Sequence, residues 1–235
     1  MKRILFYFAI GALFTGVSAQ ANDAGDLVFP ADYASYKVRA EVMYENLQRD
    51  IRITSPTRIK ESLDADVFAL RVQTDIGRVA RLDFDVGAMS AGSGSHKLMG
   101  GVGLRFLAFE HEAWRGGAFG QVRYAPDLND RLDLGDGRER VKYDLVEADA
   151  GFLVNYRLRL ADQFNVVPYA GPVVSIVRLS GDVRGEDGGR FRADEDQILG
   201  AVLGLGLEFQ GMNGIRFETR YFDDWSVSVS ASFVF

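Results

Sequence analysis

The 235-residue sequence contains no cysteine, only two histidines, and no long apolar run after residue 17. Without cysteine, the exported chain has no disulfide bond, no thiol chemistry and no attachment point for a lipoprotein anchor. Without a later apolar run of about 18 residues, no further membrane-spanning helix is predicted. The formal net charge is −6 and nearly all the cations are arginine, a balance that argues against nucleic acid as a partner.

The first 21 residues have the composition of a secretory signal peptide. Lys2 and Arg3 form a short basic start, residues 4–17 are uncharged, and small residues that suit a cleavage site follow. An uncleaved anchor is the alternative, but the apolar stretch is short for one. We therefore predict a cleaved signal peptide at 1–21, a short periplasmic segment at 22–35 and one domain at 36–235.

The rest of the chain alternates between apolar and polar residues with the period of a β-strand. In residues 82–86, for example, Leu82, Phe84 and Val86 alternate with Asp83 and Asp85. Ten such stretches occur, and none has a charged residue on its apolar face. The charged residues that we assign to the opposite faces are Arg39, Glu41, Arg71, Arg81, Asp83, Asp85, Arg105, Arg123, Glu147, Asp149, Arg157, Glu208, Arg216, Glu218 and Arg220.

Two all-β architectures fit this alternation. A soluble barrel or sandwich would bury the apolar faces, whereas a transmembrane barrel would turn them toward lipid and the charges toward the lumen. Glycines on the polar faces suit a crowded lumen, and strands of about ten residues suit a tilted membrane crossing. Aromatic residues near strand ends predict a girdle at the membrane interfaces, formed by Tyr36, Tyr44, Trp114, Tyr124, Tyr156, Tyr169, Tyr221 and Trp225. We predict a closed antiparallel up-and-down transmembrane barrel of ten strands, with eight as the alternative.

The last eleven residues, Trp225 to Phe235, alternate strictly and end on an aromatic residue. With this terminal strand and the predicted signal peptide at 1–21, the chain resembles the small outer-membrane β-barrel proteins of Gram-negative bacteria, of the compact eight- to ten-strand class. The resemblance implies that the barrel-assembly machinery reads the terminal strand, with Phe233 and Phe235 as the assembly signal. It also implies an outer-membrane location and contact with lipopolysaccharide.

The connections between the predicted strands alternate in length. Short links are expected near residues 75–78, 110–116, 160–163 and 210–214, and longer loops at 50–59, 90–96, 125–140 and 181–194. Short periplasmic turns opposite long outer loops are typical of these barrels. An even strand number places both termini on the periplasmic side and pairs the first strand with the last, which leaves no open edge. Acidic clusters in the loops lack the spacing of a calcium loop, and we predict no metal or cofactor.

The interior determines the functional hypotheses. Arginine pairs well with carboxylates, so the lumen charges predict a structural ion-pair network in a non-enzymatic, monomeric barrel with an envelope-structural or surface-interaction role. A narrow channel for small solutes is the first alternative. An apolar strip at Pro168, Ala170, Pro172, Val174 and Ile176, expected to face inward, would offer a site for a hydrophobic compound instead.

The third alternative is an enzyme that acts on lipid A or peptides. Such chemistry needs a histidine or acidic group that activates a nucleophile near the outer rim. Only His96, beside Ser95, and His111 are available as histidines, and Asp223 and Asp224 form an acidic pair without an adjacent histidine. The Gly/Ser-rich surroundings of His96 are typical of a loop, so no catalytic residue is predicted.

Overall fold

The computed structural model of the chain describes residues 38–55, 58–76, 79–92, 94–134, 137–184, 189–209 and 213–235. The predicted signal peptide, the segment 22–35 and Tyr36 lie outside these residues. No helix among them is long and apolar enough to cross a membrane. The strands are β1 (Val38–Ser55), β2 (Ile59–Ile76), β3 (Ala80–Ala91), β4 (Lys97–His111), β5 (Trp114–Asp133), β6 (Arg138–Tyr156), β7 (Leu158–Ala161), β8 (Phe164–Arg184), β9 (Arg190–Glu195), β10 (Leu199–Phe209), β11 (Asn213–Tyr221) and β12 (Trp225–Val234).

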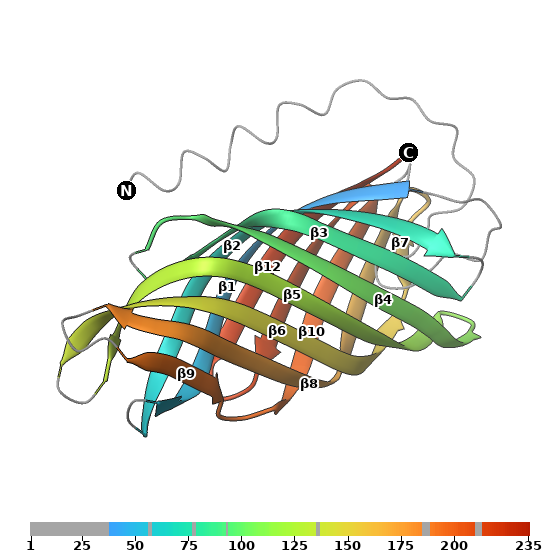
Figure 1. Cartoon of the computed structure of the whole chain (residues 1–235). Helices are drawn as coiled ribbons and strands as arrows, with labels where there is room; N and C mark the ends of the chain where they lie inside the picture. Colours follow the sequence, from blue (N-terminus) through green and yellow to red (C-terminus); the bar gives the residue numbers. More distant parts are fainter. Residues whose placement is uncertain are drawn as a thin grey trace, which may run out of the picture.

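Ten of these strands form a ring of antiparallel pairs, wrapped obliquely around a common axis (Figure 1). Strands β1 to β6 follow one another, β6 pairs with β8, β8 pairs with β10, and β10 to β12 lead back to β1. The expected pairing of the first strand with the last is present, with Arg39 opposite Val234. We predicted ten strands, and the described residues contain these ten ring strands and two short extra ones, β7 and β9.

The set of strands that forms the ring changes along the axis of the ring. In one part all ten strands take part, and we call this part the belt. Beyond it, β9 takes the place of β10, β11 and β12 between β1 and β8, with Ile51 opposite Glu195 and Arg178 opposite Asp194. We call this second part, residues 47–55, 59–67, 125–134, 137–145, 177–184 and 190–195, the cap. The cap lies at the left end of Figure 1 and the carboxyl terminus at the right end.

The cap corrects the prediction of long loops. Most of residues 50–59, 125–140 and 181–194 belong to paired strands rather than loops, and β5 and β6 pair as far as Asp133 and Arg138. Asp127 and Asp130, which we assigned to a solvated loop, therefore lie on β5. The prediction failed because the alternation continues with the opposite polarity: apolar side chains point inward here and charged ones outward. A search that takes the apolar face of every strand as the outer face cannot detect a strand whose two faces exchange polarity along its length.

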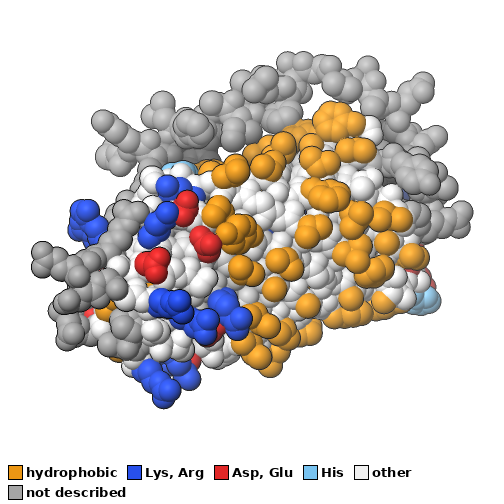
Figure 2. Space-filling view, in the orientation of Figure 1, with side chains coloured by type: hydrophobic (Ala, Val, Ile, Leu, Met, Phe, Trp, Pro, Cys, Tyr) orange, Lys and Arg blue, Asp and Glu red, His pale blue; other side chains and the backbone are white. Residues whose placement is uncertain are grey.

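Large apolar side chains are exposed on the outer wall of the belt. They come from all ten ring strands, with representatives such as Val42, Leu70, Phe84, Val102, Val122, Phe152, Ile176, Leu203, Phe217 and Val227. Figure 2 shows these side chains spread over the belt, whereas Lys, Arg, Asp and Glu gather at the cap end. Exposed apolar surface of this extent does not occur on ordinary soluble monomers.

Strand β8 corrects two of our assignments. Pro168, Ala170, Pro172, Val174 and Ile176 alternate with the buried Val167, Val173 and Val177, so the predicted inward apolar strip faces outward. Tyr169 is only 4% exposed and points into the ring, so it does not belong to the aromatic girdle. Both faces of this strand are apolar, and alternation therefore gives no signal for which side is buried.

Candidate functional site

The charged side chains assigned to the lumen lie inside the ring. Arg157, Glu218 and Arg220 are half-buried, and the other twelve are buried. Except for Arg157, which lies between β6 and β7, each comes from a strand whose neighbouring positions carry apolar side chains of the outer wall. Because successive strand residues point to opposite faces, these charged side chains point inward.

One set of ion pairs joins neighbouring strands. Asp85 lies directly opposite Arg71 in the ladder between β2 and β3, and accepts hydrogen bonds from its Nε at 2.7 Å and its Nη2 at 2.8 Å. Asp83 accepts a hydrogen bond from Arg105 Nε at 2.9 Å. These pairs are fixed by strand register, and the two-pronged contact holds the guanidinium in one orientation.

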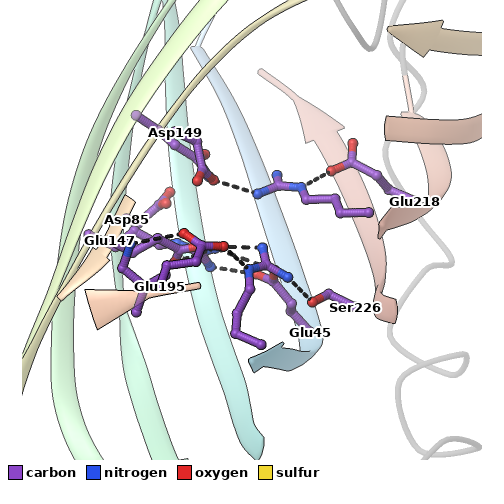
Figure 3. Close-up of polar contacts among 12 residues, drawn as sticks. Glu45, Asp85, Glu147, Asp149, Glu195, Glu218 and Ser226 are labelled. Carbon is purple, nitrogen blue, oxygen red and sulfur yellow. Dashed lines mark hydrogen bonds and ion pairs between the residues drawn. The ribbon is translucent and has the colours of Figure 1, made fainter. Parts of the chain in front are cut away.

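A second set crosses the interior between strands that are not neighbours. Arg123 on β5 contacts Glu45 on β1 across the interior, and its Nη2 also lies 2.7 Å from Glu147, directly opposite on the neighbouring strand β6. Arg220 on β11 lies 2.7 Å from Asp149 on β6 and 2.8 Å from Glu218 on its own strand. Figure 3 shows this group reaching from wall to wall. The cross-lumen pairs tie opposite walls together.

Arg49 marks the boundary between the charged interior and the cap. Its guanidinium lies 3.3 Å from Glu195 and 3.8 Å from Glu147, hydrogen-bonds Ser226, and stacks on the Phe222 ring at 4.2 Å. Glu195, the last residue of β9, also accepts a hydrogen bond from the backbone N–H of Val177 at 3.0 Å. Burial raises the pKa of the Glu195 carboxyl to about 7, although Arg49 opposes this rise. The arrangement anchors the end of β9 over the lumen.

Above Arg49 the interior is apolar. Side chains from all the cap strands pack into one cluster, which includes Leu47, Ile51, Leu63, Leu128, Leu132, Val141, Leu145, Leu179 and Phe191. The rings of Tyr143 and Phe191 lie 5.7 Å apart in its centre. The cluster fills the end of the ring that β9 completes, so the charged interior is covered on this side by a packed core.

Sequence reasoning missed several members of this interior. Glu45 stands on the polar face of the first predicted strand and would have been found by applying the alternation to the end. Arg49 and Glu195 lie next to the predicted loops 50–59 and 181–194, and no sequence signal brings them together. We assigned Tyr169 to the outer face of its strand, but it points inward. Its hydroxyl donates a hydrogen bond to Glu218 at 2.7 Å, and its ring lies against Gly204.

Glycine makes room for this last contact. A Cβ at Gly204 would lie 2.0 Å from Tyr169 Cζ, and a Cβ at Gly151 would lie 2.6 Å from the ring of Phe119. Each aromatic residue is the cross-strand partner of its glycine. The glycines of the polar faces therefore hold inward aromatic rings flat against the wall, and any side chain at these positions would displace them.

Six of the predicted girdle residues are partly or fully exposed and form ring pairs or hydrogen bonds. Trp114 stacks obliquely on Tyr156 at 4.7 Å, and Tyr221 on Trp225 at 4.8 Å, while the Tyr124 hydroxyl donates to Asp144. Tyr44, half-buried, donates to Asp66 at 2.7 Å. The outermost residue, Phe235, is 82% exposed.

The histidines lie far from the charged interior. His96 stacks on Phe68 at 6.1 Å outside the ring, and His111 is exposed at the end of β4. Asp223 and Asp224 lie in the bend between β11 and β12. Within the described ranges, no cluster of three or more His, Asp or Glu side chains has the geometry of a metal site.

Comparisons with known proteins place the chain beside outer-membrane β-barrels. No family model and no curated protein matches the sequence. Among solved structures, the translocator domain of the autotransporter NalP from Neisseria meningitidis matches with 10% identity and a TM-score of 0.45, covering 87% of this chain and 90% of that one. Ail of Yersinia pestis matches with 11% identity and a TM-score of 0.32, covering 85% and 99%. An outer-membrane channel from Pseudomonas putida F1 matches with 10% identity and a TM-score of 0.38, covering 93% and 100%. These structural neighbours are outer-membrane β-barrels.

Proposed function

We propose that the chain is an integral outer-membrane barrel with a filled, non-conducting interior, and that it serves an envelope-structural or surface-interaction role without catalysis. The observation that carries the proposal is the belt. Exposed apolar side chains encircle the ring on all ten strands while the inner face is charged. Lipid satisfies the first surface, and the ion pairs satisfy the second.

The packing of the interior supports the absence of conduction. Arg123 and Arg220 bridge opposite walls, and the apolar cluster of the cap covers one end. A conducting pore needs a continuous wet path, with coordinating groups that bind an ion and release it. Arginines held by two carboxylates each are poor groups for this purpose.

Planar-bilayer recording tests this part of the proposal. The purified protein, inserted into a planar bilayer, should give no discrete conductance steps at any voltage, while an open porin inserted by the same procedure gives them. Regular steps from the wild-type protein would favour the narrow-channel function instead. Unchanged lipid A profiles on expression, with and without His96→Ala, would be the expected result for a non-enzymatic barrel.

Orientation follows from the asymmetry of the ring. The cap faces the cell exterior in this proposal, because its outer wall is charged and its hairpins rise beyond the belt, whereas both termini lie on the periplasmic side. A protease added to intact cells should cut at the cap hairpin around residues 134–137 or 184–190 and spare the turn at 112–113. Cutting of that turn alone would reverse the orientation.

The exposed terminal residue supports a role in assembly. Phe235 hydrogen-bonds through its backbone N–H to Val38 O, but its side chain packs against little of the protein. Phe235→Asp should therefore cost little stability once the barrel is folded, yet lower the amount that reaches the folded state in cells. The heat-modifiable band on a gel measures this amount, and purified refolded protein is the control. An undiminished band would remove the assembly role of Phe235.

A further inference from the structure

A hollow of about 470 Å³ lies where the connection between β3 and β4 meets β5 and β6 in the cap. It is lined by Gly94, Ser95, Lys97, Asn129, Asp130, Arg131, Arg140 and Val141. Glycine shapes it: a Cβ at Gly94 would lie 2.1 Å from the Asn129 carbonyl oxygen, so only glycine lets the connection lie this close to β5.

Three cations line the hollow without a carboxylate partner. Arg131 and Arg140 are exposed and stand directly opposite each other across the β5–β6 ladder. Like charges at opposed positions destabilise a sheet. Lys97, Arg131 and Arg140 form no ion pair with any of the residues that the structure describes.

Other cations of the same wall are neutralised. Lys142 lies two residues after Arg140 on the same face of β6, and its Nζ is 2.6 Å from Asp127 Oδ1. Arg178 lies 2.9 Å from Asp194, and Arg52 and Lys60 share Asp196. The contrast is local, because paired and unpaired cations occur on the same strands. It points to an anion that is not part of the chain.

Among the described residues that line the hollow, the one carboxylate does not supply that anion. Asp130 accepts a hydrogen bond from the backbone N–H of Arg131 at 2.7 Å, and its Oδ1 lies against Gly92, where a Cβ would be 2.1 Å away. Burial raises the pKa of the Asp130 carboxyl. Asp130 lies on the same face of β5 as the buried Leu128 and Leu132, opposite to the face that carries the Arg131 side chain.

The hollow begins at the edge of the belt. Leu98, next to Lys97, is 71% exposed and is the first apolar side chain of β4 on the outer wall. If the belt lies in the bilayer, as proposed above, Lys97 is at the level where lipid phosphates start, and the two arginines lie farther out. Guanidinium groups bind phosphate through paired hydrogen bonds, and lysine binds it as a point charge.

We propose that this hollow binds a phosphate group of the lipopolysaccharide that surrounds the barrel in the outer leaflet, with Arg131 and Arg140 as the guanidinium pair and Lys97 as the cation nearest the membrane. The inference rests on the proposed membrane placement of the belt. It goes beyond that placement by assigning a defined site and a ligand group.

The test compares matched variants of the folded, liposome-inserted protein. Binding of lipopolysaccharide should weaken by roughly tenfold or more in Arg131→Gln/Arg140→Gln, since hydrogen bonds to charged groups are involved. The control Lys142→Gln/Arg178→Gln removes the same charge from the same wall, at cations that already have partners, and should stay within about twofold of wild type. Equal weakening in both variants would mean general charge attraction and would overturn the site. If the double variant fails to fold, Lys97→Gln takes its place with the same expectation.

Two further measurements identify the ligand. Lipopolysaccharide with its phosphates removed should bind wild type as weakly as native lipopolysaccharide binds the double variant, and equal binding of both forms would overturn the proposal. Inorganic phosphate should not displace lipopolysaccharide at a matched phosphate concentration, and displacement would assign the hollow to free phosphate. Failure of the wild type to insert into liposomes would contradict the membrane placement itself, whereas insertion without phosphate preference would contradict only this site.

Discussion

The belt and the cap are made from the same strands, yet they have opposite interiors. On β1, Arg39, Glu41 and Glu45 point inward in the belt, whereas Ile51 and Ile53 point inward in the cap. The pleat does not shift between them. What changes is the outer wall, which is apolar around the belt and charged around the cap. A strand that crosses from lipid into water must exchange the polarity of its two faces, because each face has to match the medium or the packing that it meets.

The comparison also separates two ways of filling a ring. The belt is held by charges that need partners, and the loss of one partner leaves a charge stranded. The cap is held by apolar packing, in which the loss of a side chain leaves a cavity. Substitutions matched between the two parts should therefore differ in a predictable order.

The largest effect is expected from Arg123→Ala. It leaves Glu45 and Glu147 facing each other in the belt without their shared cation, at a cost of about 3–5 kcal/mol. Arg178→Ala on the outer wall of the cap breaks an exposed pair with Asp194 and should cost about 0–1 kcal/mol. Urea unfolding in detergent, followed by gel mobility, measures both. Similar losses in the two variants would mean that the belt interior is wet and screened.

The next effect should come from Leu145→Ala, which opens a cavity in the apolar cluster of the cap. Leu145 is fully buried, so the expected loss is about 2–5 kcal/mol. Leu205→Ala, on the outer wall of the belt, should cost less, since lipid or detergent fills the vacated space. The same unfolding assay applies. A larger loss at Leu205 would show that this part of the belt is packed against protein.

Arginine scanned along β2 locates the boundary between the two outer walls. Ser62 and Leu70 point to the same face of one strand, the first in the cap and the second in the belt. Leu70→Arg should cost about 2–4 kcal/mol near the bilayer midplane. Ser62→Arg should stay within about 0.5 kcal/mol, as surface substitutions do. Unfolding in lipid vesicles is the measurement. A harmless Leu70→Arg would contradict the proposed membrane belt and would favour a soluble protein.

The smallest effect is a pH dependence at the junction. The pKa of Glu195 is raised in the folded protein to about 7 from its usual 4.5, so the folded state binds this proton more tightly than the unfolded chain. The contribution of Glu195 to stability is therefore greatest below about pH 4.5 and declines as the pH rises through about 7. Glu195→Gln should flatten the stability profile in that window, measured by urea unfolding across it. Asp182→Asn, at an exposed position on the outer face of β8 in the cap, is the control. An unchanged slope in Glu195→Gln would separate Glu195 from the pH response.

Sequence reasoning succeeded where one face of a strand is purely apolar. Arg81, Asp83 and Asp85 alternate with apolar neighbours over the first half of β3, and the structure has these charges inside the ring. Sequence reasoning failed on β8, where apolar residues occupy both faces. There it assigned Tyr169 and the apolar strip that begins at Pro168 to the wrong faces. Period two assigns a residue to a face, but only a difference between the faces identifies which one is inside.

The sequence by itself determined that the chain is built from alternating strands and which charges share a face in the belt, because these features depend on residues two positions apart. Only the tertiary structure decided that Arg123 meets Glu45 across the ring, that Arg49 meets Glu195, and that β9 replaces three strands to form the cap. These contacts join residues 78 and 146 or more positions apart along the chain. They depend on the number, tilt and stagger of all the strands together, which no local pattern contains.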